Sequence, residues 1–352
     1  MRLLLTVAIG WIFSWSFFQI QESPGPRESV IARAQTLIDA GELNEAAELL
    51  VDYLQKDPND EAANVKLGQL RITQGLHEDA LKSFETVLSL KPDSATARDG
   101  EIKAAEALAL ADRNIGIDGN ALLCLIRARK FVPDSPQLLL DFGVQAEHMK
   151  IYVDADDALT KAHQLSPSDP KIIYALAHVQ LDEQKMPEAE ANLRAYLKIR
   201  PEDSTAHYGL GRLLHMLLRN DEAMAEFGRS VELQPRQSES YFEMGEIAQE
   251  ANQPDVARQR YDKVLSQAPH HGGALTGMGI LEFQAHNYSS AEKDLHDAIT
   301  YAPDYVTAHH YYSLVLTRLG RDADARREAD LAASLREREE KTRRGNQLTV
   351  LE

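Results

Sequence analysis

The sequence contains a single cysteine, Cys124, among its 352 residues. One thiol cannot form an intrachain disulfide, and it cannot supply a cysteine-ligated zinc site or a CxxC redox centre. Cys124 lies within the apolar stretch ALLCLIRA, so we interpret it as a small buried residue rather than a reactive thiol. Disulfide scaffolds and thiol oxidoreductases are therefore excluded as classes.

Positive charge is scarce relative to negative charge. Thirty-eight Lys and Arg residues stand against 55 Asp and Glu residues, which gives a formal net charge of −17. Nucleic-acid backbones are bound through Lys and Arg, so this balance argues against a nucleic-acid partner. It also argues against docking on anionic lipid, and we interpret the charge as a solvated acidic surface.

Motifs that carry chemistry are absent as well. The sequence contains no HExxH, phosphate loop, GxSxG or GxGxxG pattern. The pairs His270-His271 and His309-His310 are adjacent in sequence, whereas helical metal ligands require a spacing of four. We therefore expect no enzymatic activity, no cofactor and no metal.

Long apolar runs are limited to the N-terminus, where Leu3 to Ile20 carries no charge. Arg2 precedes this run, and QESPGP follows it as a short linker over residues 21–26. Residues 1–20 could be a secretory signal cut after Ser16, or an uncleaved anchor, which requires roughly 18 or more apolar residues. Both interpretations predict that the remaining chain is exported, to the periplasm or the extracellular space, or is anchored to a membrane by residues 3–20.

What the sequence does contain is a regular series of prolines that follow apolar helical runs. Successive members are 34 residues apart, except for one gap of 41: Pro58, Pro92, Pro133, Pro167, Pro201, Pro235, Pro269 and Pro303. Twelve residues before each proline, and once more where the next proline is missing, the sequence has alanine: Ala46, Ala80, Ala121, Ala155, Ala189, Ala223, Ala257, Ala291 and Ala325. A fixed period of this length indicates a repeat architecture.

Each period predicts a helical hairpin. AANVKLGQLRITQG and HEDALKSFETVLSL illustrate the two helices, with apolar residues at spacings of three and four. Gly41, Gly75 and Gly320 fall just after a first helix, where a left-handed closing residue is favoured. One hairpin cannot bury its own apolar face, so neighbouring hairpins must stack. The predicted fold class is therefore all-α, and the predicted architecture is an α-solenoid.

The pattern resembles the tetratricopeptide repeat family. Its best unit here contains Leu67, Gly68, Ala80, Phe84 and Pro92. The resemblance implies a right-handed superhelix of about nine hairpins over residues 27–337, with a charged cap and tail over 338–352. The expected units are 27–60, 61–94, 95–135, 136–169, 170–203, 204–237, 238–271, 272–305 and 306–337.

The third unit is seven residues longer than the others, with ADRNIGIDGN placed between its helices. Asp112, Asn114, Asp118 and Asn120 resemble part of a calcium loop. Gly116 replaces an acidic ligand, however, and the closing Glu is missing. We interpret this segment as a polar turn.

The resemblance also implies that the first helix of each hairpin lines a concave wall. Side chains spaced by four and three would form one stripe per unit. These stripes are Tyr174, His178 and Leu181; Tyr208, Arg212 and His215; Phe242, Glu246 and Gln249; Thr276, Ile280 and Phe283; and His310 with Leu314. The predicted peptide-binding residues are Tyr174, His178, Tyr208, Arg212, His215, Phe242, Glu246, Phe283 and His310.

Two interpretations of these aromatic stripes remain open. The rings could anchor a peptide in the groove, or they could pack against the next hairpin. The family's carboxylate clamp, built from Lys and Asn, does not match the residues on this wall.

The sequence predicts a non-catalytic scaffold that binds a protein or peptide outside the cytoplasm. Membrane contact is expected only through the N-terminal segment. The alternative is an accessory subunit of an envelope-associated enzyme complex that handles a polymer or glycan. An intrinsic enzyme is the third hypothesis.

Overall fold

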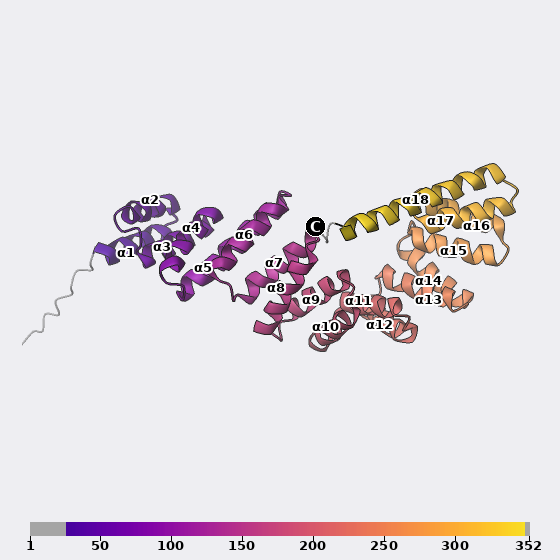
Figure 1. Cartoon of the computed structure of the whole chain (residues 1–352), viewed down its shortest axis with the longest axis horizontal. Helices are drawn as coiled ribbons and strands as arrows, with labels where there is room; N and C mark the ends of the chain where they lie inside the picture. Colours follow the sequence, from indigo (N-terminus) through magenta and orange to yellow (C-terminus); the bar gives the residue numbers. More distant parts are fainter. Residues whose placement is uncertain (1–25, 349–352) are drawn as a thin grey trace, which may run out of the picture. The chain divides into compact units, whose positions relative to one another are not determined.

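The structure is a computed structural model that describes residues 26–348, with side-chain environments over residues 29–341. Residues 26–348 form eighteen α-helices and no strand (Figure 1). The predicted all-α solenoid is therefore confirmed. The N-terminal run from Leu3 to Ile20 lies outside the described residues, and none of the described helices is long and apolar enough to cross a bilayer.

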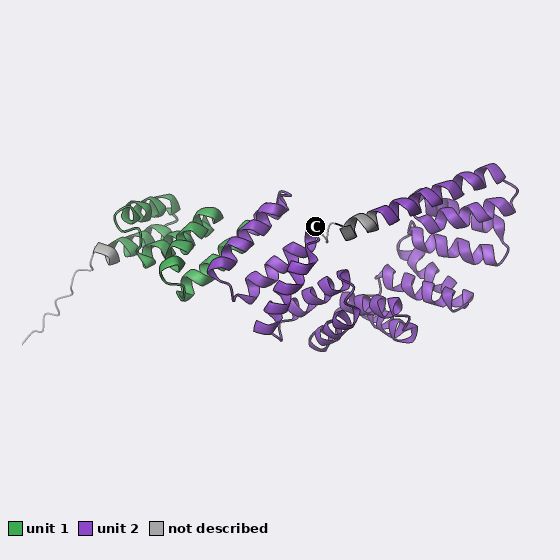
Figure 2. Cartoon of the chain, in the orientation of Figure 1, with its two compact units in different colours: residues 1–108 green, residues 109–352 purple. Residues whose placement is uncertain are grey.

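The chain divides into two compact units, residues 1–108 and 109–352, and the division falls inside α5, Ala95–Asn114 (Figure 2). Unit 1 contains four complete described helices: α1 Pro26–Asp39, α2 Leu43–Leu54, α3 Glu61–Thr73 and α4 His77–Leu90. In this unit α1 packs on α2, and α3 packs on α4. Each pair is one helical hairpin.

Unit 2 continues the same arrangement. Its complete helices are α6 Asp118–Phe131, α7 Pro136–His148, α8 Tyr152–Leu165, α9 Pro170–Asp182, α10 Met186–Ile199, α11 Ser204–Met216, α12 Asn220–Leu233, α13 Ser238–Glu250, α14 Pro254–Gln267, α15 Gly272–Gln284, α16 Tyr288–Tyr301, α17 Val306–Arg318 and α18 Asp322–Leu348. The last helix continues through residue 338 without a break, and the Arg338 guanidinium bonds Asp304 at 2.8 Å.

Small residues allow close approach within each hairpin. Eight of the nine periodic alanines have no exposed surface, and Ala325 is 6% exposed. A Cβ added to Gly245 would lie 2.6 Å from the Tyr261 ring, and one added to Gly277 of the next hairpin would lie 2.4 Å from the same ring. Tyr261 therefore fills a slot between two hairpins that only glycine leaves open.

The turn inside every hairpin contains one residue with positive φ. Four of these residues are glycines, including the three predicted from the sequence, and five are not: Gly41, Gly75, Gly116, Gly320, Lys150, Gln184, Leu218, Asn252 and His286. They follow the same spacing as the prolines. At Leu218, the amide of Arg219 donates to the Leu214 carbonyl at 2.9 Å, which is the bonding pattern of a Schellman cap.

The long third repeat accommodates its extra residues in a helix. Its first helix, α5, has 20 residues, whereas α3, α7 and α9 have 13 each. Asp112 and Asn114 belong to α5, and Asp118 and Asn120 belong to α6, so only residues 115–117 connect the two helices. No group of three His, Cys, Asp or Glu side chains in the described part of the chain could hold a metal ion.

Contacts between helices show which side of unit 2 is the inner one. First helices contact the first helices of neighbouring hairpins, in the pairs α7–α9, α11–α13, α13–α15 and α15–α17. The second helices in the described part of unit 2 pack mainly against the first helices on either side of them. The first helices are therefore closer together, and they form the concave wall on which the predicted binding residues lie.

Candidate functional site

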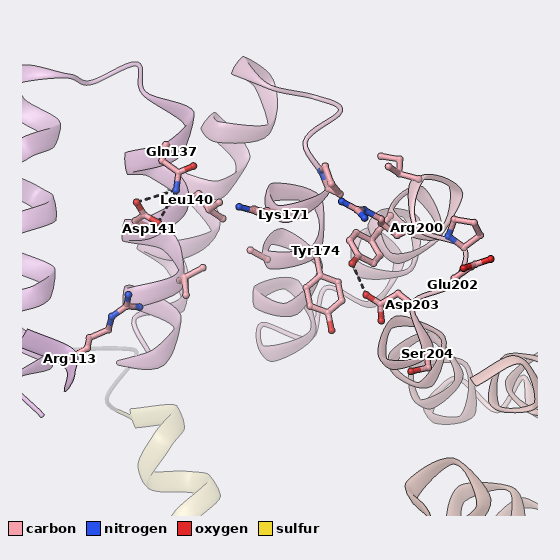
Figure 3. A pocket seen from close by; sticks show the side chains of 16 residues that line it. Arg113, Gln137, Leu140, Asp141, Lys171, Tyr174, Arg200, Glu202, Asp203 and Ser204 are labelled. Atoms are coloured by element: carbon pink, nitrogen blue, oxygen red, sulfur yellow. Dashed lines mark hydrogen bonds between the residues drawn. The ribbon is translucent and has the colours of Figure 1, made fainter. Parts of the chain in front are cut away.

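The concave wall of unit 2 contains an open pocket of about 960 Å³ between α7, α9 and the connection from α10 to α11 (Figure 3). Val144 of α7, Tyr174 of α9 and Ile199 of α10 supply its exposed apolar surface, and the buried Leu140 lies behind them. Lys171 and Arg200 supply its cationic groups. Arg113, at the end of α5, also lines the pocket.

Helix caps hold two sides of this pocket. Asp169 caps α9 by accepting the Lys171 amide at 2.9 Å, and Pro170 provides the preset φ of the first helical turn. Asp203 caps α11 by accepting the Thr205 and Ala206 amides at 3.0 Å. These caps fix where α9 and α11 begin, and with them the rim of the pocket.

Tyr196 joins the α10 helix to the α11 cap. Its hydroxyl donates to Asp203 Oδ2 at 2.7 Å, and burial together with this hydrogen bond raises the pKa of Tyr196 to about 12. The ring of Tyr174 lies 4.8 Å from the Tyr196 ring and 4.6 Å from the His178 ring. Two of the predicted residues, Tyr174 and His178, thus belong to one aromatic cluster at the pocket.

His178 lies within the wall although water still reaches its ring. Its side chain is exposed, but the surrounding wall removes enough solvent to lower the pKa of the imidazole, and this outweighs the opposing effect of Asp182. Burial, together with Asp203 and Glu147, raises the pKa of the Tyr174 phenol. Both groups are therefore neutral at pH 7 and suited to aromatic and hydrogen-bonding contacts.

A second cluster combines predicted residues of α11 with Glu243 of α13, which was not predicted. The Arg212 guanidinium carbon lies 5.9 Å from the centre of the Tyr208 ring, and its Nε lies 3.5 Å from Glu243 Oε1. His215 bonds Asn220 within its own hairpin, Nδ1 to Oδ1 at 3.0 Å. Burial, with Glu243 and Glu250 nearby, raises the pKa of Glu246 to about 7.

Phe242 and Phe283 make contacts across hairpins, whereas His310 contacts a ring of its own helix. The Phe242 ring lies 5.0 Å from His271, and the Phe283 ring lies 6.1 Å from Tyr311 in an edge arrangement. His310 is exposed, and its ring lies 5.4 Å from Tyr311. Phe242 and Phe283 are only half-buried. Each therefore packs against a neighbour and still presents surface to the groove.

The prediction for the stripe on α15 was partly wrong. Thr276 and Ile280 are 1% and 5% exposed, so neither lines the open wall. The Thr276 hydroxyl donates to the Gly272 carbonyl of its own helix at 2.8 Å. Glycines at this end of α15 let the adjacent hairpins approach closely, which buries positions that stay open on α9 and α11.

Sequence reasoning missed several groups of this site. Glu147 occupies the same position in α7 as Leu181 does in α9, and burial with Asp182 nearby raises its pKa to about 7. The 34-residue period could have located it, because Leu140, Val144 and Glu147 form the stripe that precedes Tyr174. No periodic signal marks Tyr196 or Arg200, since they reach the pocket from a second helix and its connection.

Comparison with protein families identifies the class. Family models described as tetratricopeptide repeat match residues 37–107, residues 174–238 and 276–338, and residues 239–271. The chain belongs to the tetratricopeptide repeat family, whose fold serves as a scaffold for protein interactions. No curated protein matches the sequence.

Two solved structures with TM-scores above 0.5 share the fold. The structure of PilF from Pseudomonas aeruginosa has 18% identity and a TM-score of 0.53, covering 61% of this chain and 97% of that one. The anaphase-promoting complex assembly Cut9–Hcn1 has 14% identity and a TM-score of 0.52, covering 88% of this chain and 61% of that one. YrrB, described as a TPR protein with an unusual peptide-binding site, has 23% identity and a TM-score of 0.44, covering 53% of this chain and 96% of that one.

Proposed function

We propose that the concave wall of unit 2 binds an extended or helical segment of a protein partner, without catalysis and outside the cytoplasm. The observation that carries this proposal is the series of aromatic rings on successive first helices, which are half-buried and face an open wall. A half-buried ring is already ordered in the free protein. Its further burial by a partner therefore costs little conformational entropy, which is the property of interface anchors.

The wall is also better suited to a segment than to a small molecule. Four successive first helices, α9, α11, α13 and α15, each carry one of these rings: Tyr174, Tyr208, Phe242 and Phe283. The rings are therefore distributed along several hairpins rather than gathered in one enclosed cavity. A helix or strand of a partner can contact anchors that are spaced in this way. The fold and the distribution of the rings together favour protein binding.

The test is affinity capture from a membrane fraction followed by mass spectrometry. The Tyr208→Ala, Phe242→Ala double variant should lose the partner that the wild-type protein captures, with unchanged far-UV circular dichroism. A matched control is Val153→Ala with Leu165→Ala, which removes exposed apolar side chains from the second helix α8. The proposal is wrong if the control loses the partner equally, or if the groove variant keeps it.

A further inference from the structure

Several large apolar side chains that are exposed to solvent lie within one short stretch of unit 2, residues 110–126. They come from the end of α5, from its connection to α6 and from α6 itself: Leu110, Ile115, Ile117, Leu123 and Ile126. Exposed apolar residues that occur singly are ordinary, whereas a group of them indicates a surface that another molecule covers. Leu123 and Ile126 are three residues apart, so they lie on one face of α6.

The repeat pattern shows that this face of α6 is unusual. Leu123 lies two residues after the periodic alanine, and this position is exposed in all nine second helices. In the other eight it has no large apolar residue: Glu48, Lys82, Asp157, Ala191, Ala225, Gln259, Lys293 and Arg327. At the position of Ile126 the others are polar or glycine, except for Val51 of α2. The solenoid therefore does not require an apolar outer face on α6.

The contacts of α6 within the chain use its opposite face. Successive residues of a helix are rotated by about 100°, which places Leu123 and Ile126 opposite the buried side of α6. That side consists of Ala121, Cys124, Leu125 and Ala128. Helix α7 packs on α6, and its Phe142 ring lies 4.2 Å from the Arg129 guanidinium carbon. Leu123 remains 62% exposed and Ile126 38% exposed, so the outer face is open.

Charge is distributed unevenly along α6. Its first turn contains Asp118, whose side chain is 36% exposed, and its last turn contains Arg129 and Lys130. Arg129 is engaged with the ring on α7, whereas Lys130 is exposed on the outer side. The outer face therefore has an acidic end, an apolar centre at Leu123 and Ile126, and a basic end.

From this arrangement we propose that the outer face of α6 binds the same face of a second copy of this chain, with the two α6 helices antiparallel about a two-fold axis. Leu123 of each copy then packs on Ile126 of the other. The acidic first turn of each helix lies beside Lys130 of the other, and the antiparallel helix dipoles attract each other. One surface supplies both complementary halves, which favours a second copy as the partner.

This interface is separate from the concave wall. It uses none of the aromatic residues of the first helices, and its failure would leave the proposed function untouched. It would join two solenoids through their outer faces, so that each copy keeps its own groove free for a partner segment.

Sedimentation velocity of the full chain tests the proposal. At concentrations up to about 100 µM the protein should show a reversible equilibrium between monomer and dimer, because a contact of one helix per copy is smaller than a standard interface. Leu123→Glu with Ile126→Glu should weaken dimerisation by about tenfold or more, since it places carboxylates against one another at the centre of the contact. The chain already has glutamate at these two positions in α2 and α4, respectively, so the helix tolerates the change.

The matched control is Leu165→Glu with Leu331→Glu. It makes the same change at exposed apolar positions of α8 and α18 and should leave dimerisation unchanged. Far-UV circular dichroism of both double variants should match the wild-type spectrum. Every variant retains residues 1–25, so an association through that segment would persist in all of them.

Cysteine pairing tests the direction of the two helices. In a Cys124→Ala background, the Leu123→Cys protein is mixed with the Ile126→Cys protein and oxidised. Antiparallel pairing places position 123 of one copy opposite position 126 of the other, whereas two identical cysteines are offset by about 4.5 Å along the helix axis. The mixture should therefore give more disulfide-linked dimer than either protein alone.

Three results would overturn the inference. A wild-type chain that stays monomeric throughout would mean that a different molecule covers α6. Equal effects of the two glutamate double variants would place the dimer contact elsewhere. More disulfide-linked dimer in either cysteine protein alone than in the mixture would contradict the antiparallel arrangement.

Discussion

At the scale of single residues, Leu218 adopts a backbone conformation that destabilises the folded protein locally. Its φ is +59°, and its side chain is 82% exposed. The left-handed conformation costs a residue with a Cβ about 1–2 kcal/mol, and the exposed side chain recovers little of that through burial. The capping geometry of the hairpin imposes the conformation, because the adjacent amides must reach the last carbonyls of α11.

Leu218→Gly should therefore stabilise the protein by about 0.5–1 kcal/mol, after allowance for the greater freedom of glycine in the unfolded chain. Gly75→Ala makes the opposite change at φ +74° and should destabilise by a similar amount. Denaturant melts of both variants provide the measurement. A destabilised Leu218→Gly would mean that the leucine makes a contact that outweighs its backbone cost.

Ionisation of Glu246, on the concave wall, makes the stability of the folded protein depend on pH. Burial and the neighbouring Glu243 and Glu250 raise its pKa to about 7. The folded protein then binds a proton more tightly than the unfolded chain. Stability contributed by this proton is fully present below pH 4.5 and is lost as pH rises to about 7.

Glu246→Gln should stabilise the protein at pH 8 by about 1 kcal/mol and have little effect at pH 4.5, since the amide resembles the protonated acid. Urea melts at both pH values test this. Glu188→Gln, at an exposed position on α10, is the control and should change stability equally little at both. A gain at pH 4.5 as large as that at pH 8 would contradict the assignment to ionisation.

At the scale of secondary-structure elements, the spacing of helices depends on which glycines face a ring. Gly245 of α13 faces Tyr261, where an added Cβ would lie 2.6 Å from the ring, whereas one added to Gly209 of α11 would meet nothing within 4 Å. Both residues are in helix interiors. The two positions therefore separate helix propensity from helix packing.

Gly245→Ala should destabilise the protein by about 1–3 kcal/mol, because the new methyl group overpacks the slot around Tyr261. Gly209→Ala should stabilise it by about 0.5–1 kcal/mol through helix propensity alone. Thermal or urea unfolding gives both values. If the two alanines have the same sign, the slot between hairpins does not set the helix spacing.

Some features of the helical hairpins could be predicted from the sequence, and others could not. The nine alanines and the three glycines predicted to adopt positive φ follow from periodicity, because every hairpin solves the same packing problem. The five non-glycine turns could not be predicted, since nothing in Lys150 or Gln184 favours a left-handed backbone. The burial of Thr276 depends on how closely two particular hairpins approach, which one stripe of sequence does not contain.

The pocket was not predicted for the same reason. Its rim depends on the bond between Tyr196 and Asp203, two residues in different hairpin positions that the fold brings together. The 34-residue period predicts only the positions that recur in every hairpin. Groups that occur once, such as Lys171 and Arg200 in the lining of the pocket, are found only when the helices are placed.

At the scale of the whole molecule, we propose that the N-terminal run determines where the scaffold works. We propose export, because Leu3 to Ile20 carries no charge and Arg2 precedes it. N-terminal sequencing of the mature protein should give a start near Phe17 if the segment is a cleaved signal. An intact Met1 or Arg2 in the membrane pellet indicates an anchor. Full-length protein recovered from the cytoplasmic fraction would contradict both.

The central claim is that a partner segment lies on the concave wall of unit 2. Site-specific photo-crosslinking tests it most directly, with benzoyl-phenylalanine placed at His178 on the wall or at Glu188 on the second helix α10, both exposed positions. The account predicts that the partner crosslinks through position 178 and not through position 188. Crosslinking only through position 188, or equally through both, would contradict it.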